Sequence, residues 1–242
     1  MNKLYDRFRA RLGVLSLIVL LVASHTVFDT SLDDLRGKSF DFYQSLSPRT
    51  AAADNVVVVG VDDETIGVEG RWPWPRNRIA DLISAIHASG VTVLGVDVLF
   101  SEPDESPGGV VRDDLLARAI ASSPTILATS IGDFPGSSIP DTSVGWVVVG
   151  NGNAEALPWQ PGIISSTATI RAGAAGLGIV RSVSDSDGVV RTVPLVWAAK
   201  AADQLSLWPA FSLELARVHQ SGTGYALRVR PSGFEALKLG ET

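Results

Sequence analysis

The stretch RNRIADLISAIHASGVTVLGVD, residues 76–97, places a helix pattern directly before a strand pattern. Four aliphatic side chains recur at spacings of i, i+3, i+4 and i+7, along one side of a helix: Ile79, Leu82, Ile83 and Ile86. Gly90 is a natural stop for that helix, and residues 91–96 are an apolar run typical of a buried strand. This stretch therefore predicts a helix that leads into a strand of an α/β protein.

The same alternation continues on both sides of this stretch. Residues 56–61 are a valine run typical of a strand buried on both faces of a sheet. Residues 113–122 predict a second helix with acidic residues in its first turn, and residues 124–131 predict a third strand. The order strand, helix, strand, helix, strand indicates a parallel βαβαβ core with right-handed crossovers.

The second half of the chain predicts antiparallel additions to this core. Two apolar runs, residues 178–182 and 189–198, flank an Asp-Gly pair at 187–188, which is a strong signal for a hairpin turn. Residues 207–219 predict a further helix. The expected fold class is therefore α/β, with a mixed sheet that combines the parallel core with an antiparallel hairpin.

The last predicted strand covers residues 225–230, where apolar and polar residues alternate. Its apolar side consists of Tyr225, Leu227 and Val229, and we expect this strand to have an unprotected edge. An unprotected edge invites pairing with another chain, so self-association is expected.

The N-terminal region carries a membrane signal. Residues 1–28 contain four basic residues against the single Asp6, although the whole chain has a formal net charge of −6. Residues 12–28 carry no formal charge and would span about 26 Å as a helix, just enough to cross a bilayer. Basic residues before this run and acidic residues after it predict a cytoplasmic N-terminus and an extracytoplasmic main domain. The alternatives are a cleaved signal peptide, with a cut near Ala23 and Ser24, and a buried soluble helix.

These signals divide the chain into four segments. Residues 1–11 form a cytoplasmic basic segment and residues 12–28 a transmembrane helix. Residues 29–55 contain a juxtamembrane helix at 32–46 and a linker, and residues 56–242 form the extracytoplasmic domain. The expected location is the cell membrane, with a single pass in this chain.

The composition argues against several kinds of chemistry. The sequence contains no cysteine, which removes disulfides, thiolate nucleophiles and Cys-ligated metals. Its three histidines, His25, His87 and His219, give little material for a His-based triad or a three-His metal site. The net charge of −6 argues against a nucleic-acid partner, which requires a basic face. We therefore predict no metal, no cofactor and no catalytic residues.

Candidate ligand-binding residues gather around the predicted helix start near residue 76. They are Arg71, Trp72, Trp74, Arg76 and Arg78. The three arginines lie where unpaired backbone N–H groups already favour an anion, and the two tryptophan rings can stack on a ligand or form a cation–π wall. The alternative is structural: the prolines fix the turn, the tryptophans close the end of the sheet, and the arginines pair with the acidic residues at 62–64.

Two further candidate ligand contacts, Asp62 and Asp97, follow the ends of the first two predicted strands. Parallel strands end at the same edge of a sheet, where open α/β sheets place their binding sites. Such carboxylates can bind a divalent cation, act as acid and base, or instead cap a helix and pair with arginine. A second acidic pair, Asp185 and Asp187, is similar to a calcium loop but has no glutamate at the EF-hand spacing, so we predict a simple turn.

Several of these motifs occur together in the order of a known family. They are Asp62, RWPWPR at 71–76, GVDVLF at 95–100 and DSDGVVR at 185–191. Over roughly residues 35–242, the chain resembles the CHASE domains of the second type, extracellular sensor modules associated with cyclases and histidine kinases. The resemblance implies further membrane helices and a cytoplasmic output domain, neither of which is in this sequence. It also implies that the sensor domain is incomplete at its C-terminal side.

Three functions remain open from the sequence. The leading expectation is the extracytoplasmic ligand-sensing domain of a membrane-bound signal-transduction receptor whose output enzyme, a cyclase or kinase, lies outside this chain. The second is an extracytoplasmic metal-assisted hydrolase that uses Asp62, Asp63 and Asp97. The third is a non-enzymatic assembly module of the cell envelope. We expect the chain itself not to be an enzyme.

The expected partners follow from these functions. They are a small ligand or an envelope protein, and the membrane through residues 12–28. A second copy of the chain is a further expected partner, because sensors of receptor enzymes commonly work as dimers. The juxtamembrane helix would then form the seam through Leu32, Leu35 and Phe42.

Overall fold

The structure is a computed structural model that describes residues 16, 33–48, 55–134, 139–140, 144–152, 157, 159–201, 204–231 and 233–240. The chain divides into two compact units, each described here by itself. The described part of the first unit consists mainly of residues 33–48, 55–60 and Val183–Thr192. The second unit comprises Val61–Ser182 and Val193–Thr242.

The predicted transmembrane helix at residues 12–28 lies outside the described residues, apart from Ser16. Within the described ranges, each helix is either too short or too polar to cross a bilayer.

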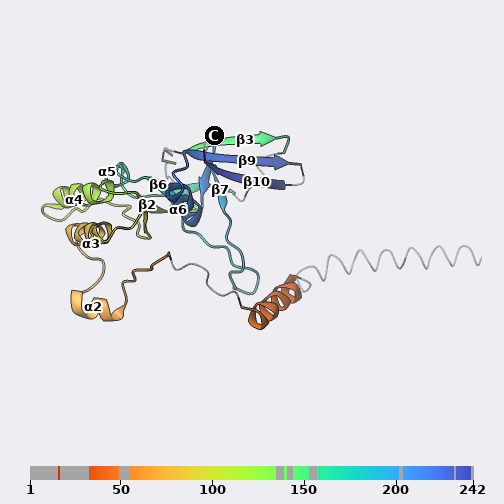
Figure 1. The fold of residues 1–242 in the computed structure, drawn as a ribbon, viewed down its shortest axis with the longest axis horizontal. Coiled ribbons are helices and arrows are strands. Elements are labelled where there is room, and N and C mark those ends of the chain that lie inside the picture. Colours follow the sequence, from red (N-terminus) through yellow and green to blue (C-terminus); the bar gives the residue numbers. More distant parts are fainter. Residues whose placement is uncertain are drawn as a thin grey trace, which may run out of the picture. The chain divides into compact units, whose positions relative to one another are not determined.

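Most elements of the second unit are labelled in Figure 1. In chain order they are α2 (Asp63–Glu69), α3 (Arg76–Ala88), β1 (Leu94–Val96), α4 (Gly109–Ala121), β2 (Thr125–Gly132), β3 (Gly145–Gly150), β4 (Trp159–Gln160), β5 (Gly162–Ile164), α5 (Ala168–Arg171), β6 (Gly176–Ile179), β7 (Val196–Ala201), β8 (Gln204–Pro209), α6 (Phe211–His219), β9 (Gly224–Arg230) and β10 (Gly233–Gly240).

The first sheet is built around β2, which pairs with three other strands. β1 runs parallel to β2, with Leu94 opposite Thr125. β6 also runs parallel to β2, whereas β5 pairs antiparallel with the C-terminal end of β2. The parallel pairing of β1 with β2, connected through α4, confirms that part of the predicted parallel core.

Helices cover both faces of this sheet. α3 and α4 pack side by side (Figure 1), and Leu94 and Val96 of β1 contact the apolar cluster that these helices share with Trp74 and Phe100. The intervening Gly95 points the other way, because neighbouring strand residues face opposite sides of a sheet. A Cβ at Gly95 would lie 2.8 Å from the ring of Phe211, so α6 covers the opposite face.

Two three-stranded sheets complete the second unit. One has the order β10-β9-β3, and these strands lie side by side in Figure 1. The other has the order β4-β7-β8. Their apolar side chains form two further clusters, one around Tyr225 and Leu227 of β9 and one around the fully buried Trp197 and Trp208. The fold is thus mixed α/β with several mixed sheets, as the sequence predicts in outline.

The first unit contains a helix over residues 33–46, where the sequence predicts a helix at 32–46; its position next to a membrane stays a prediction. Its other described part, Val183–Thr192, is a loop with a turn at Ser186 and Asp187. The amide of Gly188 donates to the carbonyl of Asp185 at 2.9 Å, which confirms the predicted turn.

The predicted strand at residues 56–61 is wrong. These residues form no strand, and the side chains of Val57 and Val58 are 83% and 89% exposed. A valine run favours the extended backbone, but a strand also needs a neighbour to accept its hydrogen bonds. No described strand pairs with this run, and the first sheet begins with β1 instead.

The hairpin predicted around the turn at 187–188 is also wrong. The two flanking runs supply β6 and β7, which belong to different sheets and do not pair with each other. A turn signal fixes only the chain reversal, whereas the partners of the strands are chosen by packing. The described hairpins join β7 to β8 and β9 to β10.

Two further boundaries differ from the prediction. The helix expected over 207–219 begins only at Phe211, because residues 204–209 pair with β7 as strand β8. The strand at 225–230 is not an edge strand, since β9 is flanked by β3 and β10. Its apolar side, Tyr225, Leu227 and Val229, is buried, so the expected unprotected edge at this strand is wrong.

Candidate functional site

The tryptophan and proline segment before α3 is anchored in the core. Trp74 is 8% exposed, and its indole Nε1 donates to the carbonyl of Gly70 at 2.9 Å. Trp72 is half-buried and packs edge-on against Trp74, with ring centroids 5.5 Å apart. Pro75 precedes the first residue of α3, where its missing N–H costs nothing. The two rings therefore fix the entry of the chain into α3.

Arg76, the first residue of α3, braces α3 against α4. Its Nε lies 3.3 Å from Oδ1 of the buried Asp113 on α4, and its guanidinium lies 4.5 Å from the ring centroid of Phe100. A terminal nitrogen also donates to the carbonyl of Glu102 at 3.2 Å. The other oxygen of Asp113 accepts from the amide of Asp104 at 3.0 Å. Arg76 thus ties α3, α4 and the loop between β1 and α4 together.

The other predicted residues do not converge on one point. Arg78 forms an ion pair with Glu69, donates to the Glu69 carbonyl at 2.6 Å, and lies 5.2 Å from the ring centroid of Trp74. Arg71 is exposed and makes no hydrogen bond or ion pair with the described residues. The structural alternative therefore accounts for Arg76 and Arg78, although their acidic partners are Asp113 and Glu69 rather than residues 62–64.

The two predicted carboxylates have separate surroundings. Asp62 caps α2: its Oδ1 accepts from the Thr65 hydroxyl at 2.6 Å and from the Thr65 amide at 2.8 Å. These bonds, above all that from the hydroxyl, lower the pKa of Asp62. Asp97 is exposed after β1 and has no bonded partner in the described ranges. No group of three or more acidic or histidine side chains among the described residues has the geometry to hold a metal ion.

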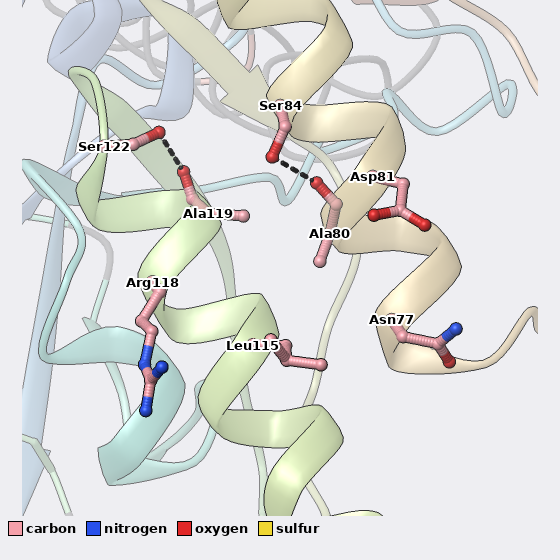
Figure 2. Close-up of a pocket in the computed structure, with 8 residues that line it drawn as sticks. All are labelled: Asn77, Ala80, Asp81, Ser84, Leu115, Arg118, Ala119 and Ser122. Atoms are coloured by element: carbon pink, nitrogen blue, oxygen red, sulfur yellow. Dashed lines mark hydrogen bonds between the residues drawn. The ribbon is translucent and has the colours of Figure 1, made fainter.

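A groove between α3 and α4 was not predicted from the sequence (Figure 2). Its volume is about 300 Å³. Its lining consists of Asn77, Ala80, Asp81, Ser84, Leu115, Arg118, Ala119 and Ser122. We call it the α3–α4 groove. A sequence signal did exist, since Asn77, Asp81 and Ser84 repeat at i, i+4 and i+7, beside the apolar face of α3.

The polar groups of the α3–α4 groove differ in their availability. The hydroxyls of Ser84 and Ser122 each donate to a carbonyl of their own helix, at 2.8 and 2.7 Å. Asp81 is exposed and makes no hydrogen bond or ion pair with the described residues, and Figure 2 shows its carboxylate in front of α3. Asn77 and Arg118 likewise make no hydrogen bond or ion pair with the described residues. The groove can therefore offer the carboxylate of Asp81 above an apolar floor of Ala80 and Ala119, next to the exposed side chain of Leu115.

A buried ionic network, also missed, joins α6 to β9. Glu214 is fully buried and accepts from Arg217 at 2.9 and 2.6 Å, and from the hydroxyl of Tyr225. Burial, followed by the bond to Glu214, raises the pKa of Tyr225, so the phenol keeps its proton and acts as a donor. Arg217 also donates to the carbonyls of Gly222 and Ala175. All parts of this network are engaged internally, which makes it a structural element of the second unit.

The described second unit is thus a mixed α/β domain that exposes a groove between two surface helices. The profile of the CHASE2 domain family matches residues 14–238, nearly the whole chain. The chain therefore belongs to the CHASE2 domain family, which is a family of extracellular sensory domains. This confirms the resemblance found in the sequence motifs. Searches of curated proteins and of solved structures found no significant match.

Proposed function

We propose that this chain is the extracytoplasmic ligand-sensing domain of a membrane-bound signal-transduction receptor. Membership of a family of extracellular sensory domains supports the sensing role. The uncharged run at residues 12–28, with basic residues before it, supports a membrane anchor and a cytoplasmic N-terminus. The output enzyme, a cyclase or kinase, belongs to a part of the receptor other than this chain.

The ligand binds in the α3–α4 groove. The observation that carries this assignment is the unengaged carboxylate of Asp81 above an apolar floor. A volume of about 300 Å³ is at the lower end of the range for small-molecule pockets. The groove suits a small polar molecule that donates a hydrogen bond to Asp81 and places an apolar side against Leu115.

The predicted arginines and tryptophans support this groove rather than line it. Arg76 holds the first turn of α3 against Asp113 of α4, and Trp74 anchors the segment that precedes α3. Their contacts set the spacing of the two helices, and a ligand between the helices acts against that spacing. Arg71 and Asp97, which have no partner in the described ranges, stay available for ligand contact.

The hydrolase alternative has less support. It requires Asp62, Asp63 and Asp97 to share a cation or a water molecule. One oxygen of Asp62 is already used to cap α2, through two bonds from Thr65.

Thermal unfolding with a panel of small polar compounds tests the ligand site. The probes are amino acids, sugars and dicarboxylic acids at millimolar concentration, added to the full chain in detergent micelles. A ligand that contributes about 1 kcal/mol by mass action should raise Tm by about 2–4 °C. We expect such a compound to stabilise the unmodified chain and to lose its effect with Asp81→Asn.

Asp114→Asn is the matched control, because it removes the same charge from α4 at a residue outside the groove lining. It should retain the stabilisation in full. A compound that stabilises Asp81→Asn as strongly as the unmodified chain would remove the groove from the proposal. No stabilisation by any compound of the panel would count against small-molecule sensing.

A further inference from the structure

A single arginine joins the helix at 33–46 to the loop Val183–Thr192 within the first unit. Arg191 donates from Nε to Oδ1 of Asp41 at 3.0 Å and from a terminal nitrogen to Oδ2 at 2.7 Å. These two parallel bonds form a bidentate fork onto the helix. Arg191 and Asp41 are 150 residues apart in the sequence, so this is a tertiary contact and not a local one.

The same guanidinium also holds its own loop. One terminal nitrogen donates to Asp185 at 2.6 Å and to Asp187 at 3.0 Å, and the other donates to Asp187 at 2.6 Å. Together with the fork onto the helix, these bonds use all five N–H donors of the guanidinium. We call Arg191 with Asp41, Asp185 and Asp187 the Arg191 joint.

The helix at 33–46 has one face on which the Arg191 guanidinium packs. Asp34, Gly37 and Asp41 lie at i, i+3 and i+7, on one face. A Cβ at Gly37 would lie 3.0 Å from Cζ of Arg191, so a glycine allows the guanidinium to rest on the helix backbone. The hydroxyl of Ser186 donates to Asp34 at 2.6 Å and fixes the loop at a second point on this face.

Burial follows the same face. Of the helical residues 33–46, only Asp34, Gly37 and Gln44 are not exposed. The side chain of Arg191 is 8% exposed, whereas every other residue of Val183–Thr192 is exposed. The joint is therefore the one well-packed point of the loop.

The two ends of the loop Val183–Thr192, which we call its arms, continue into different sheets. One arm follows β6, which pairs with β2, and the other leads to β7, which pairs with β4 and β8. The arms do not pair as strands with each other; at the tip, the amide of Asp185 donates to the carbonyl of Val189 at 2.9 Å, and the carboxylate contacts of Arg191 add to this bond. Only three residues separate β6 from the loop Val183–Thr192, and three more separate the loop from β7, so a shift between these strands has a short path along the chain to the joint.

We propose that the Arg191 joint is the coupling device through which the sensory domain holds and repositions the helix at 33–46. A displacement between β6 and β7 alters the carboxylate contacts of Arg191. The helix is held when Arg191 keeps its bonds to Asp41, and it is free to move when these bonds break. The signalling meaning of this coupling rests on the proposed sensing function. The mechanical coupling itself can be tested without any ligand.

Hydrogen exchange measured by mass spectrometry on the full chain in detergent micelles tests the joint. Arg191→Gln should speed exchange about tenfold in both 33–46 and Val183–Thr192, because each loses its partner. Exchange in α3 and α4 should stay unchanged. Arg191→Lys should give an intermediate rate, since an ammonium keeps the charge but has three donors instead of five.

Two helix variants separate the joint from general helix stability. Arg36→Gln is the matched control: Arg36 lies on the same helix with its side chain 87% exposed and only a 3.9 Å contact with Asp33. It should leave exchange in the loop unchanged. Gly37→Leu raises the helix propensity, but its side chain occupies the space where the Arg191 guanidinium packs. The loop should therefore exchange faster even though leucine favours the helix.

Coupling to the sheets requires a change made in β6. A Cβ at Gly178 would lie 2.5 Å from Cα of Phe211, so Gly178→Ala must shift β6 and the start of α6 apart. As a single substitution it should speed hydrogen exchange at 33–46. Combined with Arg191→Gln, it should not increase the exchange rate beyond that of Arg191→Gln alone. Ile179→Val is the milder variant if Gly178→Ala does not fold.

Three results would overturn the proposal. They are normal protection of 33–46 in Arg191→Gln, normal loop exchange in Gly37→Leu, and no effect of the β6 variants on 33–46. These readouts do not depend on Asp81, so failure of the ligand site and failure of the joint are distinguishable.

Discussion

Three arginines of this chain use the planar guanidinium for the same physical purpose. Arg76 joins α3 to α4 through Asp113, Arg191 joins a loop to a helix, and Arg217 joins α6 to the carbonyls of Gly222 and Ala175. Each has a side chain 18% exposed or less, where an unpaired partner is costly. At the scale of single residues, the arginines hold elements together.

Arg76→Ala should lower the free energy of unfolding by about 2 kcal/mol, because Asp113 would keep a buried oxygen without a partner. Oδ1 of Asp113 has no hydrogen bond besides its ion pair with Arg76. Urea unfolding followed by circular dichroism measures the change. Replacing both partners, as Arg76→Met with Asp113→Leu, should restore part of the loss, because the amide of Asp104 still loses its acceptor.

Arg71→Ala is the control for this measurement. Arg71 is exposed and has no partner among the described residues, so its removal should change stability by less than about 0.5 kcal/mol. Equal losses in the two single variants would show that Arg76 does not brace the helices.

At the scale of elements, buried apolar clusters join the helices and sheets of the second unit, whereas charged and polar side chains join the helix at 33–46 to its loop. The helix at 33–46 illustrates this, since Leu35, Phe42 and Leu46 are 60–65% exposed while the face with Asp34 and Asp41 receives the loop. Leu35 and Phe42 belong to the seam expected for a homodimer, whose third residue, Leu32, lies outside the described residues; this dimer stays a prediction.

The Arg191 joint should open in acid. Its hydrogen bonds from Arg191 lower the pKa of Asp41, and they lower the pKa of Asp187 to about 2. A carboxyl whose pKa is depressed in the folded state contributes stability above its unfolded value of about 3.9. That contribution is lost as the pH falls from about 4 through about 2, because Asp187 then takes up a proton.

Pulsed electron paramagnetic resonance measures this opening as the distance between two spin labels, attached at Tyr43→Cys and Val190→Cys. Both positions are exposed, at 69% and 49%, and the chain has no other cysteine. The distance distribution should stay narrow from pH 7 to pH 5 and broaden below about pH 4. Arg191→Gln should be broad already at pH 7. A distribution in the unmodified chain that stays narrow at pH 2 would contradict the carboxylate account.

At the scale of the whole molecule, the chain combines a sensory α/β unit with a smaller unit that holds a helix near the N-terminal region. If residues 12–28 anchor the protein as proposed, the helix at 33–46 follows the anchor after only a few residues. It would then be the first extracytoplasmic element to pass on any movement. With this anchor, the N-terminus is expected in the cytoplasm and the second unit outside the cytoplasm.

Cysteine labelling of intact cells tests the sidedness. The natural chain has no cysteine, so Asn2→Cys and Ser101→Cys each provide a single reactive group. A membrane-impermeant maleimide should label Ser101→Cys, which is exposed in the second unit, and spare Asn2→Cys. Both should react after permeabilisation. Labelling of Asn2→Cys alone in intact cells would reverse the proposed topology.

The sequence by itself determined the family and the elements whose signals are local. The i, i+3, i+4, i+7 spacing in residues 76–88 and the Gly at 90 predicted α3, and the apolar run at 124–131 predicted β2. The motifs at 62, 71–76, 95–100 and 185–191 indicated the CHASE2 family. Such signals depend on neighbours along the chain, so they can be found in one sequence.

Only the tertiary structure decided which elements are partners. Valine at 56–59 favours a strand, yet the described strands leave it unpaired; β6 and β7 flank a good turn, yet they join different sheets. The arginine candidates could be placed near a helix start, but their acidic partners could not be identified. Asp113 is 37 residues from Arg76, and Asp41 is 150 residues from Arg191. Contacts over such separations depend on how the core packs, and no local pattern encodes them.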